Sequence, residues 1–240
     1  MSDRTCHAVL VFLPQLRENN RKSVIQLGAQ MSAFDNPEVV ANRLQQLGLK
    51  ESPLREAIYQ GHLQRTRLTL NHPIIYHGLN MWGEVVAALR NQLRPLTWVR
   101  EDVGSYALTI HEERKLAITV ASGDEGTGNP SAHPTNRSRK GRNTMDAIEA
   151  NRRQLELFEQ LPPEVAEGEG RETWVLMHHT DISRGEIRVE LSRPLSIGKD
   201  GKITAWAERI ILASIPFDDE LVEIYPPSGP DIDIEIQRKA

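Results

Sequence analysis

The residues best suited to binding a charged ligand lie in the middle of the chain, between Gly123 and Arg142. The first part of this segment, Gly123 to Pro130, contains three glycines, which let a ligand approach the backbone and expose amides that can bind an anion. We assign this role to Gly126 and Gly128. The segment matches neither a P-loop nor a dinucleotide-binding fingerprint. It therefore predicts an anion-binding loop of no standard type, with a purely structural turn as the alternative.

Four basic residues follow the glycines within six positions: Arg137, Arg139, Lys140 and Arg142. No acidic residue lies among them, although the whole chain holds 33 acidic and 29 basic residues and has a net charge of −4. Clustered cations of this kind can contact several phosphate groups, with an affinity that falls steeply as salt is added. We interpret the cluster as a candidate contact for nucleic acid or nucleotide phosphate, the alternative being a solvated basic loop.

Asp124 and Glu125 support a different hypothesis for the same loop. Two adjacent carboxylates repel a phosphate unless a divalent cation lies between them, which is how an enzyme acting on phosphate esters or nucleic acid would use them. His178 and His179 cannot bind one metal ion together, because adjacent strand residues face opposite ways. We therefore assign no catalytic residue, no metal ligand and no cofactor, and keep a metal-dependent enzyme as an alternative function.

The basic cluster leads into a helix predicted from Thr144, which ends in the sequence Gln154-Leu155-Glu156-Leu157-Phe158. These five residues resemble the Gln-Leu-Ser/Asp-Leu-Phe peptide with which bacterial replication and repair proteins bind the sliding clamp. The resemblance implies that Gln154 fills a small polar subsite and that Leu157 and Phe158 fill a hydrophobic pocket. Short motifs of this sort owe most of their affinity to such buried residues.

The same peptide also fits an amphipathic helix that packs on a core. Ile148, Leu155 and Phe158 recur at helical spacing, and the last two are three positions apart, as neighbouring side chains on one helix face are. Gln154, Leu155, Leu157 and Phe158 are therefore candidate partner-binding residues, with core packing as the alternative. Asn143 or Thr144 is expected to cap this helix.

The hydrophobic pattern changes near Pro95 from a helical period to a period of two. Before it, helices are expected over Val24 to Met31, from Asn36-Pro37 to Gly48, from Ser52-Pro53 onward, and over Met81 to Leu93, after a short strand at Ala8 to Leu13. After it, strands are expected at Thr97 to Arg100, in two hairpins (Tyr106 to Ile110 with Leu116 to Val120, and Trp174 to Thr180 with Ile187 to Leu191), and at Ile203 to Ile215.

These elements predict an α+β protein, with a helical N-terminal third followed by a mostly antiparallel sheet and a crossing helix. We divide the chain into a mainly helical region, 1–95, an α+β region, 96–216, and an acidic, proline-rich tail, 217–240, in which Asp231 to Ile236 could pair with a sheet edge. The acidic tail and an exposed edge also allow a third function, that of a structural or assembly subunit.

The cysteine content and the apolar runs limit the cellular compartment in which the protein is expected. The single cysteine, Cys6, excludes an intramolecular disulfide framework and a thiolate zinc site. The longest apolar run, Ala8 to Leu13, is far shorter than the roughly 20 residues that cross a bilayer, and it lacks the cleavage site of a secretory signal. We expect a cytoplasmic, bacterial-type accessory or binding protein without catalytic activity and without a membrane partner. It would bind a protein, nucleic acid or the sliding clamp.

Overall fold

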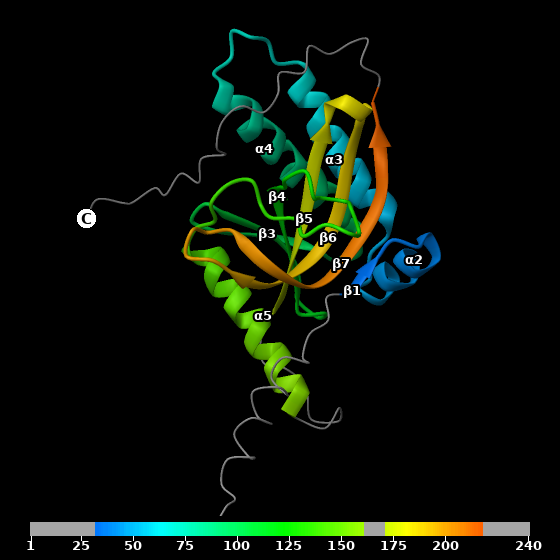
Figure 1. Cartoon of the computed structure of the whole chain (residues 1–240), viewed down its shortest axis with the longest axis vertical. Coiled ribbons are helices and arrows are strands. Elements are labelled where there is room, and N and C mark those ends of the chain that lie inside the picture. Colours follow the sequence, from blue (N-terminus) through cyan, green and yellow to red (C-terminus); the bar gives the residue numbers. More distant parts are fainter. Residues whose placement is uncertain (1–31, 161–170, 218–240) are drawn as a thin grey trace, which may run out of the picture. The chain divides into compact units, whose positions relative to one another are not determined.

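The computed structural model describes residues 32–160 and 171–217, except for the side chains of residues 157–160. Within these residues, helices pack against a seven-stranded sheet (Figure 1). The elements in chain order are β1 (Ser32–Phe34), α2 (Pro37–Gln46), α3 (Glu51–Thr66), α4 (Ile74–Leu93), the 3-10 helix η1 (Arg94–Leu96), β2 (Val99–Val103), β3 (Tyr106–His111), β4 (Leu116–Ser122), α5 (Arg142–Gln160), β5 (Glu172–Asp181), the 3-10 helix η2 (Ile182–Arg184), β6 (Glu186–Ile197) and β7 (Ile203–Pro216). The α+β class predicted from the sequence is confirmed.

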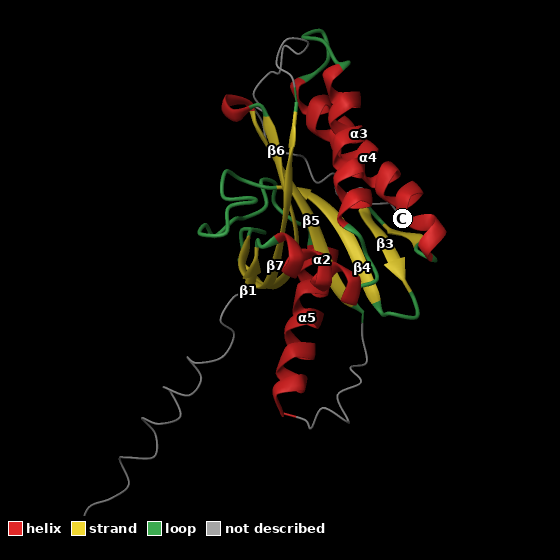
Figure 2. Cartoon of the chain, turned by 90° about the vertical axis from the view of Figure 1, so that its right-hand side faces the viewer, coloured by secondary structure: helices red, strands yellow, loops and turns green. Residues whose placement is uncertain are grey.

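The strands lie in the order β1-β7-β6-β5-β4-β3-β2. Both predicted hairpins are present as antiparallel pairs, β3 with β4 and β5 with β6, and β7 continues from β6 in the same way. Two pairs are parallel, β4 with β5 and β1 with β7. The first parallel pair requires the chain to cross the sheet between β4 and β5, and the segment that crosses contains α5 and the loop before it (Figure 2).

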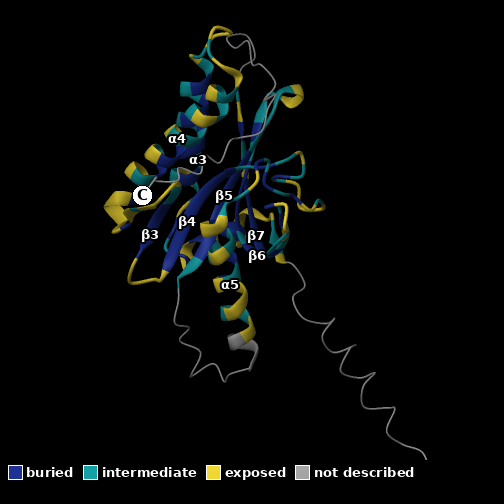
Figure 3. Cartoon of the chain, turned by 90° about the vertical axis from the view of Figure 1, so that its left-hand side faces the viewer, coloured by how far each residue is buried: buried dark blue, intermediate teal, exposed yellow. Residues whose placement is uncertain are grey.

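The sheet is covered on both faces over its central strands, so β4 to β7 are largely buried on both sides, whereas the edge strand β2 is exposed (Figure 3). On one face, apolar residues of α2, α3 and α4 form a single core with alternate strand residues such as Ile118, Leu176 and Val189. On the other face, Ile148 of α5 forms a smaller core with Met177 and other strand residues. The alternation of β-strand side chains therefore sends one set of residues to the helices and the other set to the loop and α5.

The start of α2 follows the predicted capping chemistry. The Asn36 side chain accepts hydrogen bonds from the amides of Glu38, at 3.0 Å, and Val39, at 3.4 Å, which confirms the N-cap of α2. The start predicted at Ser52-Pro53 falls in the first turn of α3. The predicted helix at Met81 begins earlier, at Ile74, directly after Pro73.

Two predictions of detail are wrong, and one short strand was missed. The strand expected at Thr97 begins at Val99, because Thr97 adopts a left-handed φ of 65° at the end of η1. The helix expected from Thr144 begins at Arg142, so neither Asn143 nor Thr144 caps it, and the Asn143 amide donates instead to the Val103 carbonyl at 3.0 Å. The short strand β1 was not predicted, because three residues give too little pattern.

Several predicted segments lie outside the described residues. They are the apolar run Ala8 to Leu13, the helix Val24 to Met31, and the acidic tail from residue 218, including Asp231 to Ile236. The division into regions 1–95, 96–216 and 217–240 stays a prediction. No helix in the described ranges is long and apolar enough to cross a membrane.

Candidate functional site

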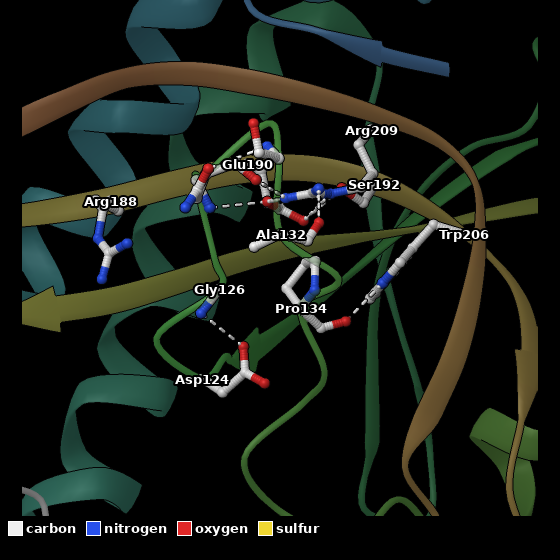
Figure 4. Close-up of polar contacts among 12 residues, drawn as sticks. Asp124, Gly126, Ala132, Pro134, Arg188, Glu190, Ser192, Trp206 and Arg209 are labelled. Carbon is white, nitrogen blue, oxygen red and sulfur yellow. Dashed lines mark hydrogen bonds and ion pairs between the residues drawn. The ribbon is translucent and has the colours of Figure 1, made fainter. Parts of the chain in front are cut away.

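The loop from Gly123 to Gly141 connects β4 to α5 and lies on the sheet face opposite α3 and α4 (Figures 1 and 2). It is built on a short bridge between Gly123 and Asn136, and the Arg137 amide donates to the Ser122 carbonyl at 2.8 Å. The loop therefore leaves the end of β4 and returns to it before α5 begins. Side chains of β6 and β7 hold it in place between these points (Figure 4).

The amides proposed to bind an anion are occupied by carboxylates of the protein. Gly126 donates to Asp124 at 3.0 Å, and Gly128 donates to Glu190 at 2.8 Å. The second oxygen of Asp124 accepts the Thr135 amide at 3.1 Å. In this conformation Asp124 stabilises the turn, and neither the anion-binding hypothesis for the two glycines nor the metal hypothesis gains support from these contacts. Both stay predictions.

A buried ion pair lies under the glycine-rich part of the loop. Arg209 of β7 and Glu190 of β6 approach to 2.5 Å, and both side chains are fully buried. Glu190 also accepts from the hydroxyl of Ser192 at 2.9 Å, while Arg209 donates to the carbonyls of Ala132, at 2.7 Å, and Asn129, at 3.1 Å. Glu190 and Arg209 thus each link the sheet to the loop (Figure 4). Their hydrogen-bonding groups are satisfied, as burial of charge requires.

Asn136 holds the next part of the loop against the turn between β6 and β7. Its completely buried side chain donates to the carbonyls of Gly201, at 3.0 Å, and Ser138, and accepts from the amide of Ile203 at 2.7 Å. The Lys202 ammonium donates to the Asn136 carbonyl at 2.8 Å and to the Arg137 carbonyl. Backbone groups that strand pairing leaves unpaired are thereby satisfied by side chains.

The basic segment around Lys140 lies very close to the turn between β6 and β7. The Lys140 amide donates to the Gly201 carbonyl at 2.9 Å. A Cβ atom at Gly201 would lie 2.8 Å from that amide nitrogen and 2.5 Å from Cγ of Arg139, and the φ of Gly201 is +73°. Only glycine fits this turn without displacing the basic segment.

This packing brings together cations from two distant parts of the sequence. We define the basic surface as Arg137, Arg139, Lys140, Arg142, Lys199 and Lys202. Arg139, Arg142 and Lys199 are exposed, and the other three are half-buried. The Arg142 side chain is 90% exposed and lies 3.9 Å from Asp146, so it is only weakly paired. Contacts through Gly201 and Lys202 therefore bring the turn that holds Lys199, Asp200 and Lys202 beside the predicted basic segment.

His179, Arg188 and Asp181 lie beside the start of the loop. Arg188 donates to the Glu125 carbonyl at 2.8 Å and contacts Asp181 at 3.3 Å, and His179 donates through Nδ1 to the Gly123 carbonyl at 3.3 Å. Burial lowers the pKa of His179, the hydrogen bond to Gly123 opposes this, and Arg188 lowers the pKa further. The net shift favours the neutral form of the imidazole. His178 is buried and faces away from this group, as predicted.

Helix α5 packs on β5 and β6 through Thr144, Ile148 and Asn151, which are buried and spaced at three and four residues. The Asn151 side chain accepts from the Thr173 amide at 2.9 Å and donates to the carbonyls of Thr173 and Pro194. Leu155 continues this stripe and is half-buried, as is Gln154. The side chains of Leu157 and Phe158 lie outside the described residues, so the clamp-binding hypothesis stays a prediction.

The fold and this surface define an α+β protein with a mixed seven-stranded sheet and a basic, structurally fixed crossover loop. Comparisons with protein-family models, curated proteins and solved structures found no match. Within the described residues, no group of three or more histidine, cysteine, aspartate or glutamate side chains is arranged to hold a metal ion.

The residues that organise the site carry only a weak signal in the sequence. In β6, Arg188, Glu190 and Ser192 alternate with apolar residues, which usually indicates a face open to solvent. Here that face is buried under the loop. The useful pattern was the charged pair Glu208-Arg209 within the mostly apolar strand Ile203 to Ile215, because a charge in a buried strand requires a partner.

Proposed function

We propose that this protein is a non-catalytic, cytoplasmic accessory or binding protein that contacts nucleic acid through the basic surface. The single observation that supports the proposal is the attachment of the basic segment to the sheet by the buried side chain of Asn136. Charges carried on a fixed backbone lose less conformational freedom on binding than charges on a mobile loop. The cations can therefore contact a phosphate backbone at a low entropic cost.

The exposed cations favour contact with phosphate groups over recognition of bases. Arg139, Arg142 and Lys199 are the most accessible members of the basic surface. No aromatic residue lies among residues 137–142 or 198–202, so the surface has no platform on which bases could stack. We expect binding that depends little on sequence and weakens steeply with salt.

The test measures the affinity for a random-sequence DNA duplex of roughly 20 base pairs. Fluorescence anisotropy monitors binding at salt concentrations from about 50 to 200 mM. The variant Arg139→Ala/Arg142→Ala should bind at least about tenfold more weakly and show a shallower salt dependence, by about one unit of slope per lost phosphate contact. Its melting temperature should match the parent's, because neither side chain supports the fold.

The matched control is Arg152→Ala/Arg153→Ala, which removes two exposed arginines of α5 that pair with Glu149. This control should bind DNA like the parent. The proposal fails if the parent does not bind at the lowest salt, or if both double variants weaken binding equally, since net charge alone would then explain the effect.

A further inference from the structure

The edge strand β2 offers a surface that the proposed function does not use. It is the last strand of the sheet, and within the described ranges it pairs only with β3. Val99 and Val103, at its two ends, are each about half exposed, at 50% and 52%. An edge strand with free backbone groups is a template for pairing with another strand.

The hairpin geometry decides which backbone groups of β2 are free. Gly104 and Ser105 form the two-residue loop to β3, with φ of +61° at Gly104, so the turn is of type II′. The flanking residues Val103 and Tyr106 then form a hydrogen-bonded pair, and such pairs alternate along an antiparallel ladder. Glu101 and Val99 therefore also direct their backbone groups toward β3. Arg100 and Asp102 direct theirs outward, to the open edge.

The sequence of this edge is complementary to itself. We propose that two copies of the protein pair antiparallel through β2, with a twofold axis at Glu101. In this register Arg100 lies opposite the partner's Asp102 and exchanges two backbone hydrogen bonds with it. Val99 lies opposite the partner's Val103. The Arg100–Asp102 pairs therefore join unlike charges, and the Val99–Val103 pairs join two apolar side chains, both of which stabilise antiparallel strands.

The side chains at the edge are suited to this pairing. Arg100 is exposed and makes no side-chain hydrogen bond or ion pair within the described part of the chain. Asp102 is about half exposed and pairs with Arg90 at 2.6 Å, which leaves one carboxylate between two arginines in the dimer. Glu101 meets the partner's Glu101 at the axis, where like charges would repel. Arg171 offsets this charge, since it contacts Glu101 through two nitrogens, at 2.7 and 3.3 Å.

Charged residues on an edge strand usually prevent pairing, because a second copy brings the same charges. Here the position of the twofold axis along β2 decides whether like or unlike charges meet. A shift of two residues along the strand brings Asp102 or Arg100 opposite its own copy, which is unfavourable. Only the register centred on Glu101 pairs Arg100 with the partner's Asp102, and the edge therefore specifies one alignment.

A charge exchange tests this register in the full chain. Sedimentation should detect a dimer of the parent between about 1 and 500 µM, since an interface of this small size is expected to be weak. Arg100→Asp and Asp102→Arg should each raise the dimer dissociation constant about tenfold or more, because two unlike pairs become like pairs. The combined variant Arg100→Asp/Asp102→Arg should recover part of the lost dimerisation, since it restores the unlike pairs but loses the contact of residue 102 with Arg90. Arg94→Asp, an exposed arginine off the edge, should have no effect.

Cross-linking gives a second test that does not require charge changes. In a Cys6→Ala background, Glu101→Cys should form a disulfide-linked dimer under mild oxidation, because non-hydrogen-bonded pairs place Cα atoms roughly 4.5 Å apart. Val99→Cys should not, since residues 99 of the two copies would lie roughly 13 Å apart. A monomeric parent, failure of the charge exchange to recover any of the lost dimerisation, or equal cross-linking at the two positions would overturn the proposal.

Discussion

Glu190 and Arg209 form a fully buried ion pair, 2.5 Å between the carboxylate and the guanidinium, on the sheet face that carries the crossover loop. Each partner also bonds the loop backbone, Glu190 at Gly128 and Arg209 at Ala132 and Asn129. A charged pair in the sheet thus determines the conformation of a segment that the sequence presents as glycine-rich and polar. The loop is fixed because its polar groups are needed to satisfy the buried pair.

Removing one partner should therefore destabilise the protein strongly. Arg209→Met leaves the Glu190 carboxylate buried without its countercharge, and we expect a loss of about 3–5 kcal/mol in the free energy of unfolding. Replacing both, in Glu190→Met/Arg209→Met, should cost less than the single change. Urea denaturation, monitored by tryptophan fluorescence, measures the free energy of unfolding of both variants. Arg152→Ala, which breaks exposed pairs only, is the control, and a similar loss in it and in Arg209→Met would refute this account.

Asn136→Ala should loosen the basic surface without removing any of its charges. The variant loses three hydrogen bonds to backbone groups, and we expect its free energy of unfolding to fall by about 2–4 kcal/mol. Amide hydrogen exchange should accelerate at residues 136–140, and DNA affinity should fall if the proposed function is right. Asn143→Ala, which removes one exposed contact to Val103, should change neither. Unchanged exchange in the Asn136 variant would show that other contacts hold the segment.

The stability of the protein should fall in mild acid because of His62. This ring is buried in α3, 4.8 Å from the ring of Phe217, and burial, with a smaller effect of Arg65, lowers its pKa to about 4. The unfolded chain, with a pKa near 6.5, binds more protons between these values, so stability is lost as pH falls from about 6.5 to about 4. The loss is at most roughly 3 kcal/mol.

Urea denaturation at pH 7, 5.5 and 4.5 measures this dependence, with the approximate pKa window setting the choice of pH. His62→Gln cannot titrate and should lose less stability over the same range. An equal loss in the variant and the parent would assign the acid sensitivity to other groups.

Leu155 and Gln154 distinguish core packing from clamp binding in α5. Leu155 continues the buried stripe of Ile148 and Asn151, so Leu155→Ala should lower the melting temperature, whereas Gln154→Ala should not. If the clamp resemblance is functional, both variants should reduce recovery of sliding clamp in a pull-down, including Gln154→Ala, which retains stability. Recovery equal to the parent's in the Gln154 variant would end that hypothesis.

The sequence by itself determined the α+β class, both hairpins and the start of α2, because these depend on local chemistry: the Asn36 cap, the period of two in β3 and β4, and turn residues between strands. It also located the cations of residues 137–142. The tertiary structure decided what lies beside them. Pairing of β6 with β7 brings together Glu190 and Arg209, 19 positions apart. Packing of the loop on the β6–β7 turn brings Lys202 to Asn136, 66 positions away. No local pattern records such pairings, since the partners of a buried charge are chosen by strand register and packing.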